Sequence, residues 1–134
     1  MNQTLNNLRP AIFLFVRIIV GYMIFSHGAI RIWDFPVPHH SGGVPVLSFM
    51  GFGSILEIVG GILILLGWYI RPAAFILCGE MAYAYFFMHA SWNDFLLPSQ
   101  NHGELAAIYA LAFLLMFVAG ADKWSLDYKV RGVL

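Results

Sequence analysis

Residues 57–89, EIVGGILILLGWYIRPAAFILCGEMAYAYFFMH, decide how the rest of the chain folds. They belong to two apolar runs, 51–68 and 73–90, which are separated by a short turn containing Arg71 and Pro72. Each run is close to the roughly 20 apolar residues that a helix needs to cross a bilayer core. Gly67 suits the end of one helix, and Pro72 suits the first turn of the next. The stretch therefore predicts a helical hairpin, because so short a turn joins only antiparallel neighbours.

The composition predicts an integral membrane protein with a single domain, residues 1–134. Hydrophobic residues make up 60% of the chain and mean hydropathy is +0.78, while only 10% of the residues are charged, against about 25% in an ordinary soluble domain. The formal net charge of 0 argues against a nucleic acid as a partner. Because Cys78 is the single cysteine, no intrachain disulfide can form, and redox chemistry would need a bound cofactor or another protein.

Four helices are expected to cross the membrane, over about residues 11–33, 50–68, 72–90 and 104–121. The first run is interrupted by Arg17, His27 and Arg31 and no small-residue cleavage site follows it, so we interpret it as a retained helix rather than a secretory signal. The segments between the helices are rich in proline, glycine and polar residues. The expected fold is an all-α membrane protein, an antiparallel four-helix transmembrane bundle.

The distribution of basic residues predicts the orientation of this bundle. One side of the membrane would carry five basic residues, and the loops on the other side only Arg31, at a helix end. The five are Arg9, Arg71, Lys123, Lys129 and Arg131. By the positive-inside rule both termini are cytoplasmic, and we expect a multi-pass protein of the bacterial cytoplasmic (inner) membrane.

Ionisable residues within apolar helices predict two polar layers. Helical spacing places Arg17 and Glu57 on glycine-containing stripes of the first two helices, so we expect these two residues to pair, in an inner layer that also holds Glu80. This layer is either a structural ion pair that fixes helix register or the polar end of a cavity for a small anion or a quinone head group. Arginine suits the second role because its guanidinium offers several fixed donors to a carbonyl or an oxyanion.

The outer layer is expected to hold His27, His89 and Glu104, with three further histidines (His39, His40 and His102) above it. His89 and Glu104 are candidates for proton acceptor and donor, since histidine titrates near neutral pH. Alternatively, these residues only end their helices in water. A metal site would need a compact ligand spacing that the sequence lacks, so we predict none.

The nine residues between Glu80 and His89 place them on opposite faces of an unkinked helix. We therefore expect that the two side chains do not face one small site. Glu80 is then either a second partner of Arg17 or a contact with another chain.

Short motifs follow one another in a fixed order: Arg17-x-x-x-Gly21, Gly28, Arg31, EIVGGIL at 57–63, Gly67-x-x-x-Arg71-Pro72-Ala73, His89, Gly103-Glu104-Leu105 and Trp124-Ser125-Leu126-Asp127. In this order and spacing they closely resemble the DoxX family of small four-helix membrane proteins, over about residues 8–127. The resemblance implies a membrane scaffold tied to redox chemistry, related to the membrane subunit of thiosulfate:quinone oxidoreductase. Arg17, Glu57, His89 and Glu104 match polar positions of the family pattern. Glu80 and the histidine-bearing loop depart from it, which suggests a specialised member.

Three functions follow as hypotheses. The first is a redox-linked subunit of a quinone-linked oxidoreductase, in which Arg17, Glu57, His27 and Glu80 bind a quinone while His89 and Glu104 carry protons. The second is a non-catalytic anchor or assembly subunit of a larger complex. The third is a carrier of small solutes or metal ions. The expected partners are the lipid bilayer and either another protein or a second copy of the chain.

Overall fold

The structure, a computed structural model, describes residues 2–35, 37–38 and 42–133. Over these residues the chain is helical, without strands. The elements are α1 (Asn2–Trp33), α2 (Phe49–Leu66), α3 (Ile70–Tyr83), the π-helix η1 (Ala84–His89), α4 (Glu104–Ala119) and α5 (Leu126–Arg131). The prediction of an all-α chain is confirmed for this part of the sequence. The four long helical segments also lie close to their expected positions, except that α1 begins well before residue 11.

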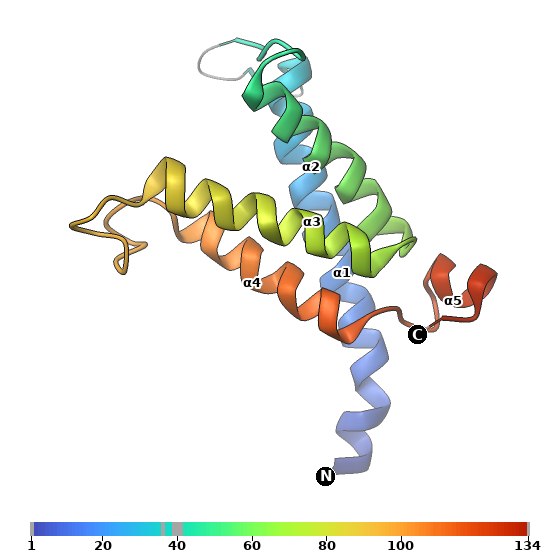
Figure 1. Cartoon of the computed structure of the whole chain (residues 1–134). Coiled ribbons are helices and arrows are strands. Elements are labelled where there is room, and N and C mark those ends of the chain that lie inside the picture. Colours follow the sequence, from blue (N-terminus) through green and yellow to red (C-terminus); the bar gives the residue numbers. More distant parts are fainter. Residues whose placement is uncertain (1, 36, 39–41, 134) are drawn as a thin grey trace.

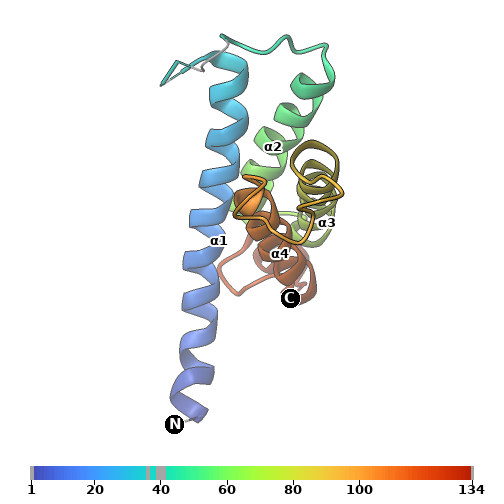
Figure 2. The same ribbon diagram turned by 90° about the vertical axis from the view of Figure 1, so that its left-hand side faces the viewer.

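The helices form two antiparallel hairpins that cross each other. α1 packs along α2, and α3 packs along α4, while the second hairpin lies across the first (Figure 1; Figure 2). This arrangement differs from four helices running side by side. The three-residue turn between α2 and α3 explains the crossing, because Gly67 and Tyr69 both have left-handed backbones, with φ of 69° and 50°. Two such residues redirect the chain sharply.

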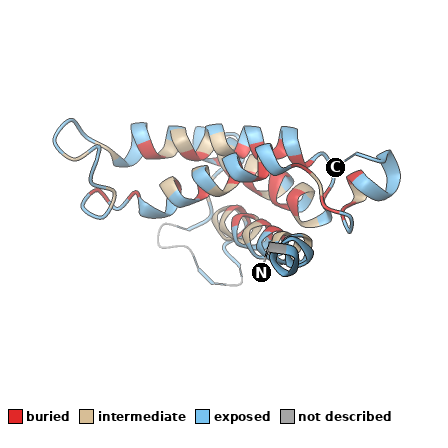
Figure 3. Cartoon of the chain, turned by 90° about the horizontal axis from the view of Figure 1, so that it is seen from below, coloured by how far each residue is buried: buried red, intermediate tan, exposed pale blue. Residues whose placement is uncertain are grey.

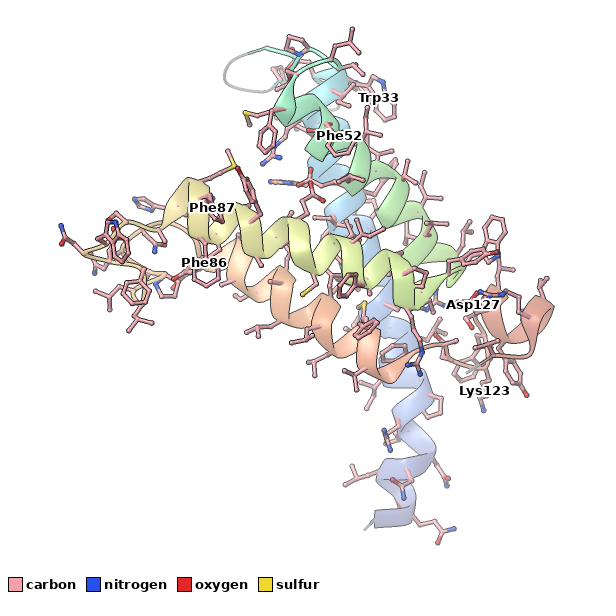
Figure 4. The ribbon with its side chains drawn as sticks, viewed as in Figure 1. Trp33, Phe52, Phe86, Phe87, Lys123 and Asp127 are labelled. Atoms are coloured by element: carbon pink, nitrogen blue, oxygen red, sulfur yellow. The ribbon has the colours of Figure 1, made fainter. Side chains whose placement is uncertain are left out.

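Two helices, α1 and α2, are long and apolar enough to cross a membrane, and α4 is a shorter apolar helix. Large apolar side chains remain exposed over much of the outer surface, and exposed residues cover the outward faces of both hairpins (Figure 3). Phe52 of α2 and Phe86 and Phe87 of η1 are among these exposed side chains (Figure 4). A soluble monomer seldom exposes so much contiguous apolar surface, so the surface fits contact with lipid.

The tightest packing lies where the hairpins cross. Ile64 of α2, Leu77 of α3 and Phe113 of α4 are completely buried. A Cβ atom added to Gly60 would come within 2.9 Å of the Leu77 side chain, so this glycine lets α3 approach α2 closely. The crossing is thereby fixed by close backbone approach.

Residues 122–127 hold the ends of several helices together. The Asp127 carboxylate accepts hydrogen bonds from the backbone N–H groups of Tyr69 and Ile70, both at 2.9 Å. These amides belong to the start of α3, where the helix itself provides no acceptor. Ser125 caps α5 through the Tyr128 N–H. Asp127, in the first turn of α5, is labelled in Figure 4. We call residues 122–127 the C-terminal clamp.

Candidate functional site

A cavity of about 580 Å³ lies between the N-terminal end of α2 and the hairpin that α3 and α4 form. Its walls come from α1, α2, α3, η1 and the beginning of α4. Aromatic side chains, including Phe49, Phe52 and Tyr109, form much of the wall. The cavity also has a polar lining of six histidine, arginine and glutamate side chains: His27, Arg31, Glu57, Glu80, His89 and His102. A large, mostly apolar cavity with a few convergent polar groups is the usual form of a small-molecule site.

Glu57 is the centre of the polar lining. Its side chain is 1% exposed, and its Oε1 atom is 3.0 Å from His27 Nδ1 and 3.4 Å from Arg31 Nη1. His27 and Arg31 are one turn apart on α1, so both reach the same carboxylate. Arg31 Nη2 is also 3.5 Å from His27 Nε2. This geometry fits a neutral His27 that donates from Nδ1 to Glu57 and accepts at Nε2 from Arg31.

Two buried carboxyl oxygens, Glu57 Oε2 and Glu80 Oε2, have no hydrogen-bond partner among the residues that the structure describes. Buried polar atoms are nearly always satisfied, so these two acceptors mark a place where ordered water or a ligand would bind. The other oxygen of Glu80 lies over Gly53, where an added Cβ would be 3.0 Å from it. The cavity thus combines the carboxyl groups of Glu57 and Glu80 with the donors of Arg31. It fits a ligand that can donate hydrogen bonds through one group and accept them through another.

Several residues that the sequence singled out lie together in the structure. His27, Glu57, Glu80 and His89 all line the cavity. Arg31 was placed at a helix end and given no role in the site. Its spacing of four residues from His27 was the signal that could have placed it there.

The expected pair of Arg17 with Glu57 is wrong. Arg17 Nε donates to Asp122 Oδ2 at 2.8 Å, and Arg17 Nη1 donates to the carbonyls of Ile64 and Leu65 at 2.8 and 2.6 Å. These carbonyls lie in the last turn of α2, where α-helical hydrogen bonds run out; that of Ile64 also accepts from the Gly67 N–H at 3.1 Å. His27 reaches Glu57 instead, because α1 and α2 run antiparallel. His27 comes ten residues after Arg17 and so lies about 15 Å further along α1. Arg17 therefore lies outside the cavity.

The expectation that Glu80 and His89 cannot face one site is also wrong. Of the two alternatives for Glu80, the structure does not show the contact with Arg17, whose hydrogen bonds go to Asp122, Ile64 and Leu65. Both Glu80 and His89 line the same cavity. The cause is η1, since a π-helix turns by roughly 80° per residue rather than 100° and so changes which face His89 occupies. Single π turns inside α-helices are frequent at functional sites.

His89 and Glu104 are both exposed, at the end of η1 and the beginning of α4. His89 lines the cavity, whereas Glu104 is not among its lining residues. Their roles in proton transfer stay a prediction. Among the described residues no group of three or more histidine, cysteine or acidic side chains is arranged to hold a metal ion. His39 and His40 lie outside the described residues.

The loop between η1 and α4 is held in place beside the cavity by local hydrogen bonds. Tyr85 donates from its hydroxyl to the Phe95 carbonyl at 2.6 Å, and the Gly103 N–H donates to the Asn101 side chain at 2.8 Å. The backbone N–H and the hydroxyl of Ser91 both donate to Asp94, which lowers the pKa of that carboxyl below its usual value. The mouth of the cavity is therefore bordered by an ordered loop.

Fold and site together define a helical membrane protein with a polar cavity enclosed between two hairpins. The sequence pattern of the DoxX family matches residues 12–90, more than half of the chain. The chain belongs to the DoxX family of membrane proteins, which confirms the resemblance. It is 44% identical over 133 residues to an uncharacterized protein of Haemophilus influenzae, an alignment that covers 93% of this chain and 97% of the relative. No solved structure matches the chain.

Proposed function

We propose that this DoxX-family protein binds a quinone head group in the cavity and serves as a proton-handling subunit of a redox system. The observation that carries the proposal is the pair of unpartnered buried oxygens, Glu57 Oε2 and Glu80 Oε2, in a cavity that also contains Arg31 and His27. Ionisable groups inside a membrane protein are costly, and they usually mark a substrate or proton path.

The lining suits both redox forms of a quinone. The hydroxyls of the reduced form can donate to the carboxylates of Glu57 and Glu80. The carbonyls of the oxidised form can accept from the guanidinium of Arg31. A volume of about 580 Å³ is within the usual range for a site of this kind, and the aromatic wall suits a flat ring.

Proton transfer follows from the same geometry. Oxidation of a quinol releases two protons and two electrons; the electrons pass to a redox centre in a partner protein. Glu57 and Glu80 accept the two protons. His27 shares a hydrogen bond with Glu57, and His89, which is exposed at the cavity mouth, relays protons toward Glu104 and water. Reduction of a quinone runs the same steps in reverse.

The topology proposed with this function places the protein in the bacterial cytoplasmic membrane, with several passes and with both termini in the cytoplasm. The support comes from charge. The acidic residues of the C-terminal segment, Asp122 and Asp127, are buried, whereas Lys123, Lys129 and Arg131 of the same segment are exposed. Exposed positive charge at this end agrees with the positive-inside rule.

The test is quinol binding by the purified protein in phosphatidylcholine nanodiscs. A short-chain benzoquinol at 100 times its dissociation constant is expected to stabilise the protein by about 2.7 kcal/mol. Glu57→Gln and Glu80→Gln each replace a carboxyl oxygen of the cavity with an amide nitrogen and are expected to weaken binding by up to about tenfold, roughly the value of one hydrogen bond. Glu104→Gln is the matched control, because Glu104 is exposed and does not line the cavity.

Absence of quinol binding, or equal binding by all three variants, would refute the proposal. In that case two other assays distinguish the remaining functions. An anchor subunit would still retain its partner proteins during purification after Glu57→Gln. A carrier would instead lose uptake of its solute or ion in proteoliposomes after the same substitution.

A further inference from the structure

A second cavity, of about 750 Å³, lies in the angle between the N-terminal half of α1 and the end of α4. The beginning of α1 extends beyond the crossed hairpins, so one side of this angle has no helix packed over it (Figure 1; Figure 2). The quinone proposal makes no use of this cavity, since the two cavities share no lining residue.

The cavity is apolar along most of its walls and basic at one end. Ile12, Phe13 and Val16 of α1 face Leu115 and Met116 of α4 across it. The polar end contains Asn6, Arg9 and Lys123. From Arg9 to Val16 the helix rises about 10 Å, slightly more than the thickness of a membrane headgroup region. The change from cationic to apolar lining therefore matches the distance between the headgroup of a lipid and its acyl chains.

The positive charge at this end is not neutralised within the site. Asp122 is the acidic residue among the lining residues, but it is buried and already accepts hydrogen bonds from Arg17 Nε and the Trp124 N–H, both at 2.8 Å. Lys123 is exposed, and its Nζ atom lies 4.6 Å from the centre of the Trp124 ring. Lys123 extends from the segment between α4 and α5 (Figure 4). Tryptophan and lysine side chains in this arrangement suit the water interface of a membrane.

We propose that this cavity binds one anionic phospholipid, with its phosphate between Arg9 and Lys123 and an acyl chain along the apolar walls. Charge complementarity favours this occupant over a second copy of the chain. Two copies in one membrane share an orientation, so a second copy would bring its own exposed basic residues, including Arg9 and Lys123, to the same depth. The acids of the same end, Asp122 and Asp127, are buried and offer no compensation.

Native mass spectrometry of the detergent-purified full chain tests the proposal. Phosphatidylglycerol is expected to bind at least tenfold more tightly than phosphatidylcholine. The double variant Arg9→Gln/Lys123→Gln should weaken phosphatidylglycerol binding about 30-fold, since each cation near an anionic lipid surface contributes a factor of about five. The matched control is Lys129→Gln, an exposed lysine on α5 that does not line the cavity and should leave binding unchanged.

Two further measurements separate the other occupants. Millimolar inorganic phosphate should not displace the lipid, because the apolar walls contribute to its binding; displacement would mean that the site recognises a free anion. A variant with a filled cavity, Ala112→Phe, should also reduce lipid binding. Equal binding of both lipids, or a dimer that persists in excess phosphatidylglycerol and strengthens in the double variant, would overturn the proposal.

Discussion

Replacing Arg17 by methionine should destabilise the protein strongly, although Arg17 lies far from the cavity. The substitution keeps much of the side-chain length but removes three hydrogen bonds of 2.8, 2.8 and 2.6 Å. Asp122 is then left buried with its charge uncompensated, and the carbonyls of Ile64 and Leu65 lose the hydrogen bonds from Arg17, although Ile64 keeps that from the Gly67 N–H. Breaking a buried ion pair by removing one partner costs about 3–5 kcal/mol, so the unfolding free energy should fall by about 4 kcal/mol.

The assay is equilibrium unfolding in mixed micelles, followed by circular dichroism. Arg17→Met/Asp122→Asn should recover roughly 2 kcal/mol relative to the single variant, because the uncompensated charge is gone while the side-chain acceptor for the Trp124 N–H is kept. Lys129→Met, on the exposed surface of α5, should change the unfolding free energy by no more than about 0.5 kcal/mol.

Two results would refute this reasoning. The first is a loss below 1 kcal/mol for Arg17→Met, a threshold well under the roughly 3 kcal/mol minimum expected for a broken buried pair. The second is a double variant that is no more stable than the single one. If Arg17→Met instead weakened quinol binding without lowering stability, Arg17 would be a ligand of the cavity and not a part of the helix packing.

Two further predictions concern close packing and helix capping. Gly28→Ala would place a Cβ atom 2.5 Å from the Ser54 carbonyl oxygen and 2.9 Å from Glu57 Cβ. It should therefore lower the unfolding free energy by about 1–3 kcal/mol in the same assay and weaken quinol binding. The control is Gly79→Ala, whose Cβ atom meets nothing within 4 Å and which should be neutral or stabilising. Asp127→Ala leaves two amides at the start of α3 without their acceptor and should cost about 1–2 kcal/mol, detected also as faster hydrogen exchange of α3; unchanged exchange would argue against the capping role.

The helices could be predicted from the sequence because apolar runs and their flanking glycine and proline residues are local signals. The prediction of a polar site rests on a local signal as well, since an ionisable residue such as Glu57 inside an apolar run is costly and needs a reason to be there. These signals identified His27, Glu80 and His89 as well, and all of them line the cavity.

The partners of these residues could not be predicted in the same way. Periodicity gives the face of a helix but not its offset along a neighbour, so the stripes on α1 and α2 permitted a pair of Arg17 with Glu57 that the actual offset excludes. The π turn of η1 is a second non-local effect, because α-helical periodicity was assumed through His89. The turn between α2 and α3 is also held by the C-terminal clamp. The Asp127 carboxylate, more than 50 residues away in the sequence, accepts from the N–H groups of Tyr69 and Ile70.

The position of the C-terminal clamp near the end of the chain also has a consequence for biosynthesis. Synthesis proceeds from the N-terminus, so α1 and α2 are made long before Asp122 and Asp127, which supply the partner of Arg17 and the cap of α3. Until those last residues are translated, a buried guanidinium lacks its counter-ion and the second hairpin lacks its fixed angle. A prematurely terminated chain would therefore insert its apolar helices but fail to lock them, which leaves it open to membrane proteases.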